Sequence, residues 1–327
     1  MVLLYHYTTR FSELFPHAIP IPFSFPAGEF GVELFFVISG FVITMTLDRS
    51  KSAADFLVAR FSRLYPAYWT AVLLTSGVLV AASGPFAVPS ANQVGFNLTM
   101  AQEFFHVPSV DGVYWTLEVE LLFYALALAV FTTGSMRRLE KPLLVWLLLA
   151  ALFASPLWGS YVEGKPFTGA LARLLILPYA PFFAMGVAFH RIYRNEGSRA
   201  WNGGLIAFAL AIVLLSAPGA MALVTLAACL LFTLLLRGRL GFLRLRPLVF
   251  LGTISYSLYL VHQKIGHTVM AKMIDDGLDP AAAVLAATLV SLGLATALTF
   301  LVERPALTAI RDWYRKNPLD PFSRQSR

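Results

Sequence analysis

Residues 219–239 read GAMALVTLAACLLFTLLLRGR, a run of eighteen residues without a charge that is followed at once by two arginines. An apolar run of about 20 residues is long enough to cross the hydrocarbon core of a membrane as a helix. The whole chain has this character, because 58% of its 327 residues are hydrophobic and only 13% are charged. Soluble domains carry roughly 25% charged residues. The composition therefore predicts an all-α, polytopic transmembrane protein.

Apolar runs of this kind predict nine full spans, which together form a transmembrane helical bundle. They cover residues 29–47, 64–82, 113–131, 143–159, 172–190, 203–217, 219–236, 248–266 and 281–302. Residues 1–9 resemble the outer end of one more helix that is cut short, because the six residues up to His6 cover only about 9 Å of a core roughly 30 Å thick. We expect either a start upstream of Met1 or a truncated product.

The basic residues alternate between successive connections. Of the 25 Lys and Arg residues, 20 lie in the segments 48–63, 132–142, 191–201 and 237–247 and in the tail from residue 303. The intervening connection 83–112 contains none. Under the positive-inside rule, the basic segments face the cytoplasm. Because topology explains the net charge of +7, nucleic-acid binding is not expected.

Ionisable residues inside the predicted spans form a second pattern. A charged group in a span costs at least about 2.5–3.5 kcal/mol, so each one marks a candidate functional site. With the predicted directions of the spans, His6, Glu33, Glu118, Glu120 and His262 all lie near the outer face. Imidazoles and carboxylates at one depth are the composition of a general acid–base site. Glu118 and Glu120 are two residues apart, so at most one of them faces such a site easily.

Two arginines occupy the opposite, cytoplasmic face. Arg60 and Arg63 are three residues apart on a predicted interfacial helix, and guanidinium groups at that spacing share a face that suits a phosphate. They could equally be anchors for lipid phosphates. The remaining histidines are interpreted as structural or solvated residues of loops and span ends: His17, His106, His190 and His267. The sequence has no metal-ligand cluster, no Gly-rich phosphate loop and no GxSxG motif, and the single cysteine, Cys229, is read as a small core or lipid-facing residue.

Six short motifs in order make the chain resemble the membrane acyltransferase 3 family, which includes bacterial O-acetyltransferases of surface polysaccharides. The motifs are VLLYHY at 2–7, GVELFFVISGFVI at 31–43, RFSRLYPAYW at 60–69, WTLEVELLFY at 115–124, ISYSLYLVH at 254–262 and ERP at 303–305. The resemblance implies a ten-helix bundle of which this chain supplies nine spans and a stub. It places the acyltransferase domain at residues 1–305, followed by a basic cytoplasmic tail at 306–327.

The resemblance also implies roles for individual residues. His6 matches the essential histidine at the end of the family's first helix, and Arg60 and Arg63 match its paired arginines. Glu33 and Glu120 match its acidic positions, and Glu118 is left as a variable one. The predicted site-lining residues are Trp115, Tyr256, Tyr259 and His262. The family's arginine eleven residues before the first histidine would fall before Met1.

The implied function is O-acyl transfer in a bacterial inner membrane. The expected donor is an acyl-CoA, most often acetyl-CoA, with no tightly bound cofactor, and the expected acceptor is a hydroxyl of a surface or lipid-linked glycan. Arg60 and Arg63 would hold the CoA phosphates at the inner face, while the pantetheine arm reaches outward between the helices. His6 would act as general base or briefly carry the acyl group, and Glu120 or Glu33 would orient the imidazole.

Three alternatives remain open from the sequence. The acceptor could be a small secondary metabolite such as an antibiotic rather than a glycan. Ionisable residues inside a bundle also mark proton-coupled transporters, although no duplicated halves are visible. The missing half of the first helix is compatible with a non-catalytic paralogue.

Overall fold

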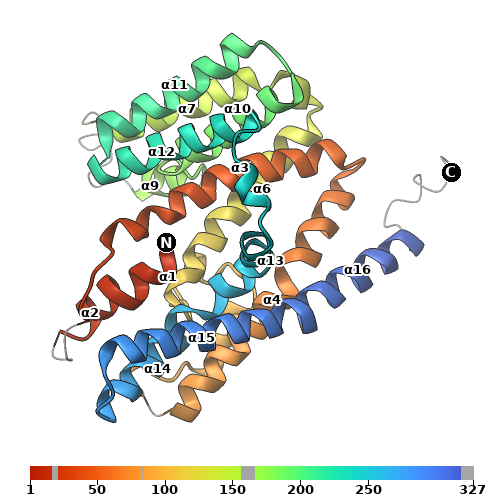
Figure 1. The fold of residues 1–327 in the computed structure, drawn as a ribbon. Coiled ribbons are helices and arrows are strands. Elements are labelled where there is room, and N and C mark those ends of the chain that lie inside the picture. The colour runs from red at the N-terminus through yellow and green to blue at the C-terminus, as the bar shows by residue number, and fades with distance from the viewer. Residues whose placement is uncertain (17–20, 83, 156–165, 218, 318–327) are drawn as a thin grey trace. The chain divides into compact units, whose positions relative to one another are not determined.

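The structure, a computed structural model, describes residues 1–16, 21–82, 84–155, 166–217 and 219–317 (Figure 1). Within these ranges every regular element is a helix. The chain divides into two compact units, of which the first comprises residues 1–29, 54–118 and 242–327 and the second residues 30–53 and 119–241.

Six helical segments are long and apolar enough to cross a membrane. In the described residues they are Pro26–Arg49, Ala53–Ala82, Gly112–Thr132, Arg199–Ser216, Gly219–Leu236 and Pro280–Lys316. Each one contains or closely overlaps a predicted span. The all-helical, multi-span architecture is therefore confirmed, and the count of nine spans stays a prediction.

The three other predicted spans differ from long apolar helices. The span 143–159 corresponds to α7 (Glu140–Ala154), and residues 156–159 lie outside the described part of the chain. The span 248–266 corresponds to the shorter apolar helix α13 (Arg246–Val261), after which the helix is interrupted at His262.

The predicted span 172–190 is divided in two by its prolines. Helix α9 (Pro166–Leu174) ends before Pro178, and α10 (Ala180–Arg194) begins with Pro181 in its first turn. Proline lacks the backbone N–H of the helical ladder, and its ring disfavours a helical conformation for the residue before it. It is accepted in a first turn, where that N–H has no partner within the helix.

The first unit contains two long helical segments and the start of the chain. Predicted as an interfacial helix and a separate span, residues 53–82 form one helix, α4 (Ala53–Ala82). Helix α15 (Pro280–Leu298) continues through a π-helical segment (Thr299–Glu303) into α16 (Arg304–Lys316). The predicted domain boundary at 305/306 falls inside α16, and residues 318–327 of the predicted tail lie outside the described residues.

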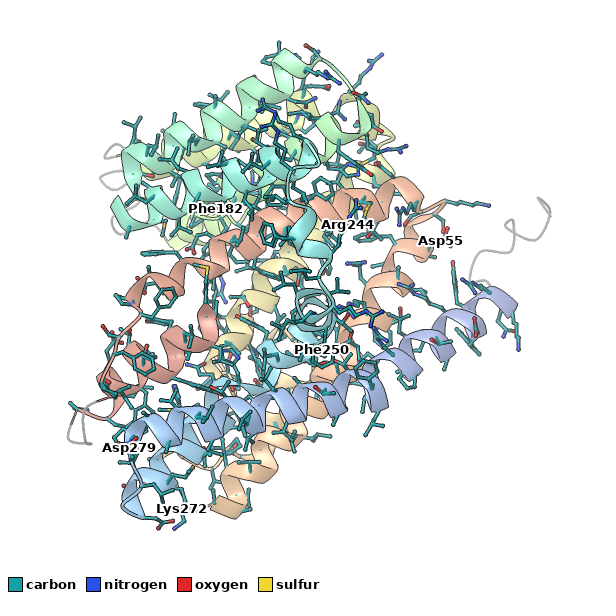
Figure 2. All side chains as sticks on the ribbon, in the orientation of Figure 1. Asp55, Phe182, Arg244, Phe250, Lys272 and Asp279 are labelled. Atoms are coloured by element: carbon teal, nitrogen blue, oxygen red, sulfur yellow. The ribbon has the colours of Figure 1, made fainter. Side chains whose placement is uncertain are left out.

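The N-terminal segment packs on α14 (Gln263–Asp275) and α15. It consists of α1 (Val2–Tyr5), a π-helical segment (His6–Arg10) and α2 (Phe11–Leu14). Tyr7 and Phe11 belong to a buried apolar cluster with Met270 and Val284. The turn before α15 is fixed by Asp279, whose carboxylate accepts hydrogen bonds from the first backbone amides of that helix (Figure 2). Burial of this cluster holds the neighbouring His6 against α14.

The second unit surrounds α10. Helices α3 (Gly31–Arg49), α7, α11 (Arg199–Ser216) and α12 (Gly219–Leu236) belong to it, and α3, α7 and α11 contact α10 directly (Figure 1). Every residue of α10 from Ala180 to Arg191 is buried. A Cβ added at Gly186 would overlap the carbonyl oxygen of Val37 on α3. Glycine is therefore what permits the close approach of α3 and α10.

One of the predicted loop arginines is part of this packing. Arg191 is only 1% exposed, and its guanidinium pairs with Glu140 at the start of α7. It also donates to the carbonyl oxygen of Met136 at 3.2 Å and to Oδ1 of Asn202 on α11 at 3.3 Å. A buried charge requires such partners, so Arg191 fastens α7, α10 and α11 together at one end.

Candidate active site

Two predicted site residues from opposite ends of the chain meet in the first unit. The rings of His6 and His262 stand edge to face with their centroids 5.1 Å apart. His6 begins the π-helical segment His6–Arg10, and π-helical turns occur frequently at functional sites. His262 lies between α13 and α14. The predicted association of these two imidazoles is therefore present in the structure.

The hydrogen bonds of His262 fix which ring nitrogen carries the proton. Nδ1 lies 2.9 Å from the carbonyl oxygen of Tyr259 and 3.2 Å from that of Leu258. A carbonyl oxygen only accepts, so Nδ1 is the donor and Nε2 carries the lone pair in the neutral ring. His262 Nε2 and His6 Nδ1 are buried and have no hydrogen-bond partner among the described residues. Two imidazole nitrogens are thus available for proton transfer.

Neighbouring side chains hold both histidines through their backbones. His267 Nε2 donates to the carbonyl oxygen of His6 at 2.8 Å. The Tyr7 hydroxyl donates to the carbonyl oxygen of His262 at 2.7 Å and lies 2.6 Å from Ser291 Oγ. These contacts bind the backbone of the two histidines and leave His6 Nδ1 and His262 Nε2 without a partner among the described residues.

The helix is interrupted beside His262, where two residues from the junction of the 83–112 connection with the following helical segment contact its backbone. In a regular helix the Lys264 amide would donate to the Leu260 carbonyl oxygen. Here the Lys264 amide donates to Asp111 Oδ2 at 2.9 Å, and the Leu260 carbonyl accepts from the Tyr114 hydroxyl at 3.3 Å. An inserted side chain is a recognised cause of a helix kink. Asp111 and Tyr114 therefore set the local path of the chain at His262.

Burial shifts the pKa values of two groups in this region. Burial raises the pKa of Asp111 to about 6, although hydrogen bonds from the backbone amides of Lys264 and Val113 act in the opposite direction. Burial lowers the pKa of His267 to about 4, against the effect of its hydrogen bond to His6. Burial therefore favours the neutral form of both groups.

Three of the sequence motifs converge on Arg63. Its guanidinium pairs with Glu303, which is 1% exposed, and lies 5.7 Å from the centre of the Tyr256 ring. Ser257 Oγ donates to the second carboxylate oxygen of Glu303 at 2.9 Å. Glu303 ends the π-helical segment Thr299–Glu303. Both π-helical segments in the described chain therefore carry a residue of this unit's polar sites.

Arg63 and His6 both contact residues of one stretch of chain, formed by α13 and the following His262. Arg63 contacts α13 at Tyr256, and His6 contacts the end of α13 at His262. Six residues separate these two points, which corresponds to about 9 Å along a helix axis. Arg63 was predicted at the face opposite the histidines. Its side chain contacts Glu303 and the ring of Tyr256, and its placement at the cytoplasmic face stays a prediction.

Arg60 has a different environment from Arg63. Arg311 of α16 lies close enough to Arg60 for their like charges to repel. Neither Arg311 nor Glu303 was assigned a role from the sequence. We refer to Arg60, Arg63 and Arg311 as the arginine cluster. Adjacent cations attract anions such as phosphate, and the predicted phosphate-binding role of Arg60 and Arg63 stays a prediction.

The predicted acidic residues Glu33 and Glu120 belong to the second unit. Glu120 is 7% exposed, and its Oε1 accepts a hydrogen bond from Ser39 Oγ at 2.9 Å. Glu33 lies in the first turn of α3. Their predicted role beside the imidazole stays a prediction.

The remaining predicted residues belong to the first unit. The Tyr259 hydroxyl donates to the carbonyl oxygen of Val113 at 2.8 Å and lies 2.6 Å from Thr116 Oγ1. The Tyr256 hydroxyl donates to the carbonyl oxygen of Leu64 at 2.9 Å. Both tyrosines therefore bind neighbouring backbone while presenting their rings to Arg63 or His262. Trp115 is half-buried at the start of α6 (Trp115–Thr132), and Glu118 is 3% exposed.

Sequence reasoning missed the residues that hold the histidines in place. Tyr7 and Glu303 were visible inside quoted motifs, without an assigned role. Asp111 precedes a glycine immediately before a span, which is a common turn signal, but that signal does not identify its distant backbone partner. His267 was read as structural or solvated; its structural role is the contact with the His6 carbonyl.

Comparison with known proteins adds independent observations. The acyltransferase 3 family model, described as an acyltransferase domain, matches residues 1–300. Exopolysaccharide production protein ExoZ of Rhizobium meliloti (strain 1021) is 30% identical over 304 residues, which are 86% of this chain and 90% of that protein. No solved structure matches the chain.

Two further relatives match over shorter stretches. Nodulation protein 10 of Rhizobium leguminosarum bv. viciae is 29% identical over 200 residues, 54% of this chain and 52% of that protein. BcsY of Komagataeibacter xylinus, whose name describes a membrane-bound transacylase, is 27% identical over 266 residues, 72% of this chain and 65% of that protein.

Proposed function

The chain belongs to the acyltransferase 3 family and is a multi-pass membrane acyltransferase, and from this premise we propose that it moves an acyl group, most often acetyl, from acyl-CoA to a hydroxyl of a surface or lipid-linked glycan. The observation that supports this most is the pair formed by His6 and His262. Each ring has a buried nitrogen without a partner among the described residues.

His6 is the proposed general base. Its free imidazole nitrogen takes the proton of the acceptor hydroxyl as the oxygen attacks the thioester carbonyl carbon. The new C–O bond forms, the C–S bond breaks, and the departing CoA thiolate takes the proton from the imidazolium to give the free thiol. The neighbouring ring of His262, which keeps its lone pair on Nε2, stabilises the positive charge of this imidazolium and does not itself take the proton. Transfer through an acyl-imidazole on His6 has the same overall balance.

The arginine cluster is the proposed donor site. Arg60, with Arg311 as a second cation nearby, binds phosphate groups of the acyl-CoA. Arg63 contacts Tyr256 and is already balanced by Glu303. A separation of about 9 Å along α13 leaves the pantetheine arm a short path between the two parts of the site.

A glycan is favoured over a secondary metabolite as acceptor. Supporting this choice, ExoZ is named for exopolysaccharide production. We place the enzyme in the bacterial inner membrane, with the basic connections and the C-terminal tail in the cytoplasm, where acyl-CoA is available. Glu120 and Glu33 keep their proposed role as the carboxylates of the acid–base site.

The test is donor-dependent acyl transfer by the purified full chain in liposomes. With [14C]acetyl-CoA and polysaccharide extracted from the host cell surface, release of free CoA thiol and labelling of the polysaccharide should occur together. His6→Gln should lose both signals while keeping its thermal transition. His106→Asn, an exposed histidine in a left-handed turn that asparagine tolerates, should keep both. Full activity of His6→Gln would refute the mechanism.

A further inference from the structure

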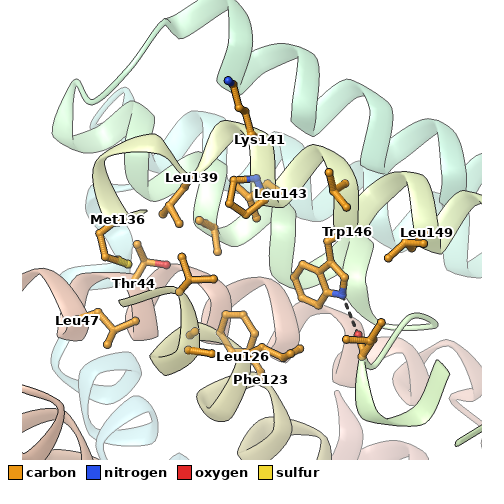
Figure 3. A pocket seen from close by; sticks show the side chains of 17 residues that line it. Thr44, Leu47, Phe123, Leu126, Met136, Leu139, Lys141, Leu143, Trp146 and Leu149 are labelled. Carbon is orange, nitrogen blue, oxygen red and sulfur yellow. Dashed lines mark hydrogen bonds between the residues drawn. The ribbon is translucent and has the colours of Figure 1, made fainter. Parts of the chain in front are cut away.

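The second unit contains an apolar pocket of about 570 Å³ that belongs to neither the histidine pair nor the arginine cluster (Figure 3). Side chains from α3, α6, α7 and α10 line it. Its volume lies within the range of about 300–1,000 Å³ typical of pockets that hold small organic ligands. The pocket is therefore large enough for a small organic ligand, and the chemistry of its lining decides which ligand fits.

The polar atoms of the lining are already engaged within the protein. Thr44 Oγ1 donates to the carbonyl oxygen of Gly40 at 2.8 Å. Trp146 Nε1 donates to the carbonyl oxygen of Leu175 at 2.7 Å, the bond drawn in Figure 3. Apart from Lys141, the lining residues therefore offer a ligand only apolar surface. A hydrocarbon chain fits this lining, and a sugar or nucleotide does not.

The pocket has a closed wall and an open rim. Leu47 and Leu143 are buried, at 2% and 6% exposure, whereas Val145 and Leu149 on α7 are 57% and 36% exposed. Two of the helices that form it, α3 and α6, are long and apolar enough to cross a membrane. An opening at the side of membrane-crossing helices faces hydrocarbon, so a lipid chain can enter without crossing water.

One charged residue stands at the edge of the pocket. Lys141 lies in the first turn of α7, and Figure 3 shows its ammonium group directed away from the apolar side chains. No hydrogen bond or ion pair engages this ammonium within the described part of the chain. Arg138, exposed and three residues earlier, adds a second positive charge. Positive charge beside a lipid-facing opening attracts an anionic head group.

We propose that this pocket binds one acyl chain of an anionic phospholipid, with the lipid phosphate at Lys141. The apolar lining selects the chain, the open rim admits it from the bilayer, and the lysine selects the negative head group. Phe123, in the pocket wall, follows Glu120 by one turn of α6. The lipid therefore packs along the same helix that carries the Ser39–Glu120 hydrogen bond. The proposal does not depend on which acyl group or acceptor the enzyme uses.

The test is native mass spectrometry of the full chain titrated with phosphatidylglycerol or phosphatidylcholine of identical acyl chains. The wild type should retain several-fold more phosphatidylglycerol. Val145→Trp places a bulky side chain at the exposed rim and should retain about tenfold less phosphatidylglycerol than the wild type. Leu148→Trp, on the same helix, 52% exposed and outside the pocket, should keep it. Equal binding by these two variants would overturn the pocket assignment.

A second pair of variants tests the pocket from α6, and a third tests the head group. Ala129→Phe, which fills the pocket, should bind less of both lipids than Ala125→Phe, which lies outside it. Lys141→Gln should bind both lipids equally, while Arg239→Gln, an exposed arginine of the same unit, keeps the preference. An unchanged preference in Lys141→Gln would overturn the role of the lysine, and wild-type binding without preference would overturn the anionic ligand.

Discussion

The rings of His262 and His6 are in edge-to-face contact at a centroid separation of 5.1 Å, while Nδ1 of His262 is hydrogen-bonded to the carbonyl oxygen of Tyr259. The hydrogen bond fixes the tautomer of His262 and leaves the lone pair on Nε2. His262 Nε2 and His6 Nδ1 both lack a partner among the described residues, so each ring keeps one nitrogen available to a substrate.

Replacement of His262 by Gln should reduce the rate of thiol release from acetyl-CoA by about 100-fold, within the usual contribution of the general base that it supports. The amide can replace the hydrogen bond from Nδ1 but cannot stabilise the imidazolium of His6 through the lone pair of a ring nitrogen. Steady-state kinetics in liposomes would measure the effect, with His106→Asn as the matched histidine control. A variant with unchanged kcat would show that His262 serves only to pack the helix.

Asp111 should contribute to stability mainly as an acceptor for the Lys264 amide. Asp111→Ala leaves that buried amide unsatisfied and should cost about 1–3 kcal/mol of unfolding free energy. Asp111→Asn keeps one acceptor oxygen and should cost less. Thermal unfolding in detergent at pH 7 would rank the three proteins. Equal losses in both variants would mean that the carboxylate charge, rather than the hydrogen bond, is what matters.

Asp111 and His267 should give opposite pH dependences of stability. The pKa of His267 falls to about 4 from 6.5, so its contribution is present above pH 6.5 and is lost as the pH falls toward 4. The pKa of Asp111 rises to about 6 from 3.8, so its contribution is present below pH 3.8 and is lost as the pH rises through 6. Each shift corresponds to about 3 kcal/mol, and in the wild type the two largely cancel.

Removing one of the two groups should therefore reveal the pH dependence that the other gives to stability. Relative to the wild type, Asp111→Asn should lose stability as the pH falls from 6.5 to 4, whereas His267→Gln should gain it over the same interval. Melting temperatures measured at several pH values would give the two slopes. Parallel curves for the two variants would contradict the assigned shifts.

Arg63 should stabilise the first unit chiefly by neutralising Glu303. Arg63→Ala leaves a buried carboxylate without its cation and should cost about 3 kcal/mol. The double variant Arg63→Ala/Glu303→Gln removes the charge and should recover most of that loss. A double-mutant cycle on thermal unfolding measures the coupling. Additive losses would show that the two side chains act independently.

Gly186 should be intolerant of any side chain. Gly186→Ala forces α3 and α10 apart at the Val37 carbonyl and should lower the melting temperature. Gly204→Ala provides the control, because a Cβ there meets no other atom within 4 Å. Alanine is favoured over glycine inside a helix by about 0.5–1 kcal/mol, so the control should be neutral or slightly stabilised. A stabilised Gly186→Ala would contradict the close approach.

The apolar runs predicted the helical, multi-span class correctly, because hydropathy acts locally and every apolar run of sufficient length produces the same element. The exceptions also have a local cause. Pro178 and Pro181 interrupt the predicted span 172–190, and attention to their missing amides would have divided it. The short helix α13 ends where Asp111 binds the Lys264 amide, and no periodicity within residues 248–266 carries that information.

The site was predictable to the extent that its residues lie in recognisable motifs. The directions of two helices place His6 and His262 at one level, and their rings lie 5.1 Å apart in the structure. The partner of Arg63 was not predicted, because a pairing with Glu303 depends on how α4 and α15 pack together. Hydropathy places a residue at a depth along its own helix, but it does not give the direction of a long side chain such as arginine.

The π-helical segment before Glu303 has a mechanical consequence. A wide turn holds one residue more than an α-helix would, and each residue of an α-helix advances the chain by about 100° around the axis. The extra residue therefore rotates the following residues around the helix axis. The rotation brings the Glu303 carboxylate to the side of the helix that contacts Arg63, and the helix stays otherwise continuous. Removing a single residue such as Phe300 would restore an ordinary helix, turn the carboxylate away and leave the arginine's charge uncompensated. An alignment gap at this position would thus alter the electrostatics of the site without changing any of its residues.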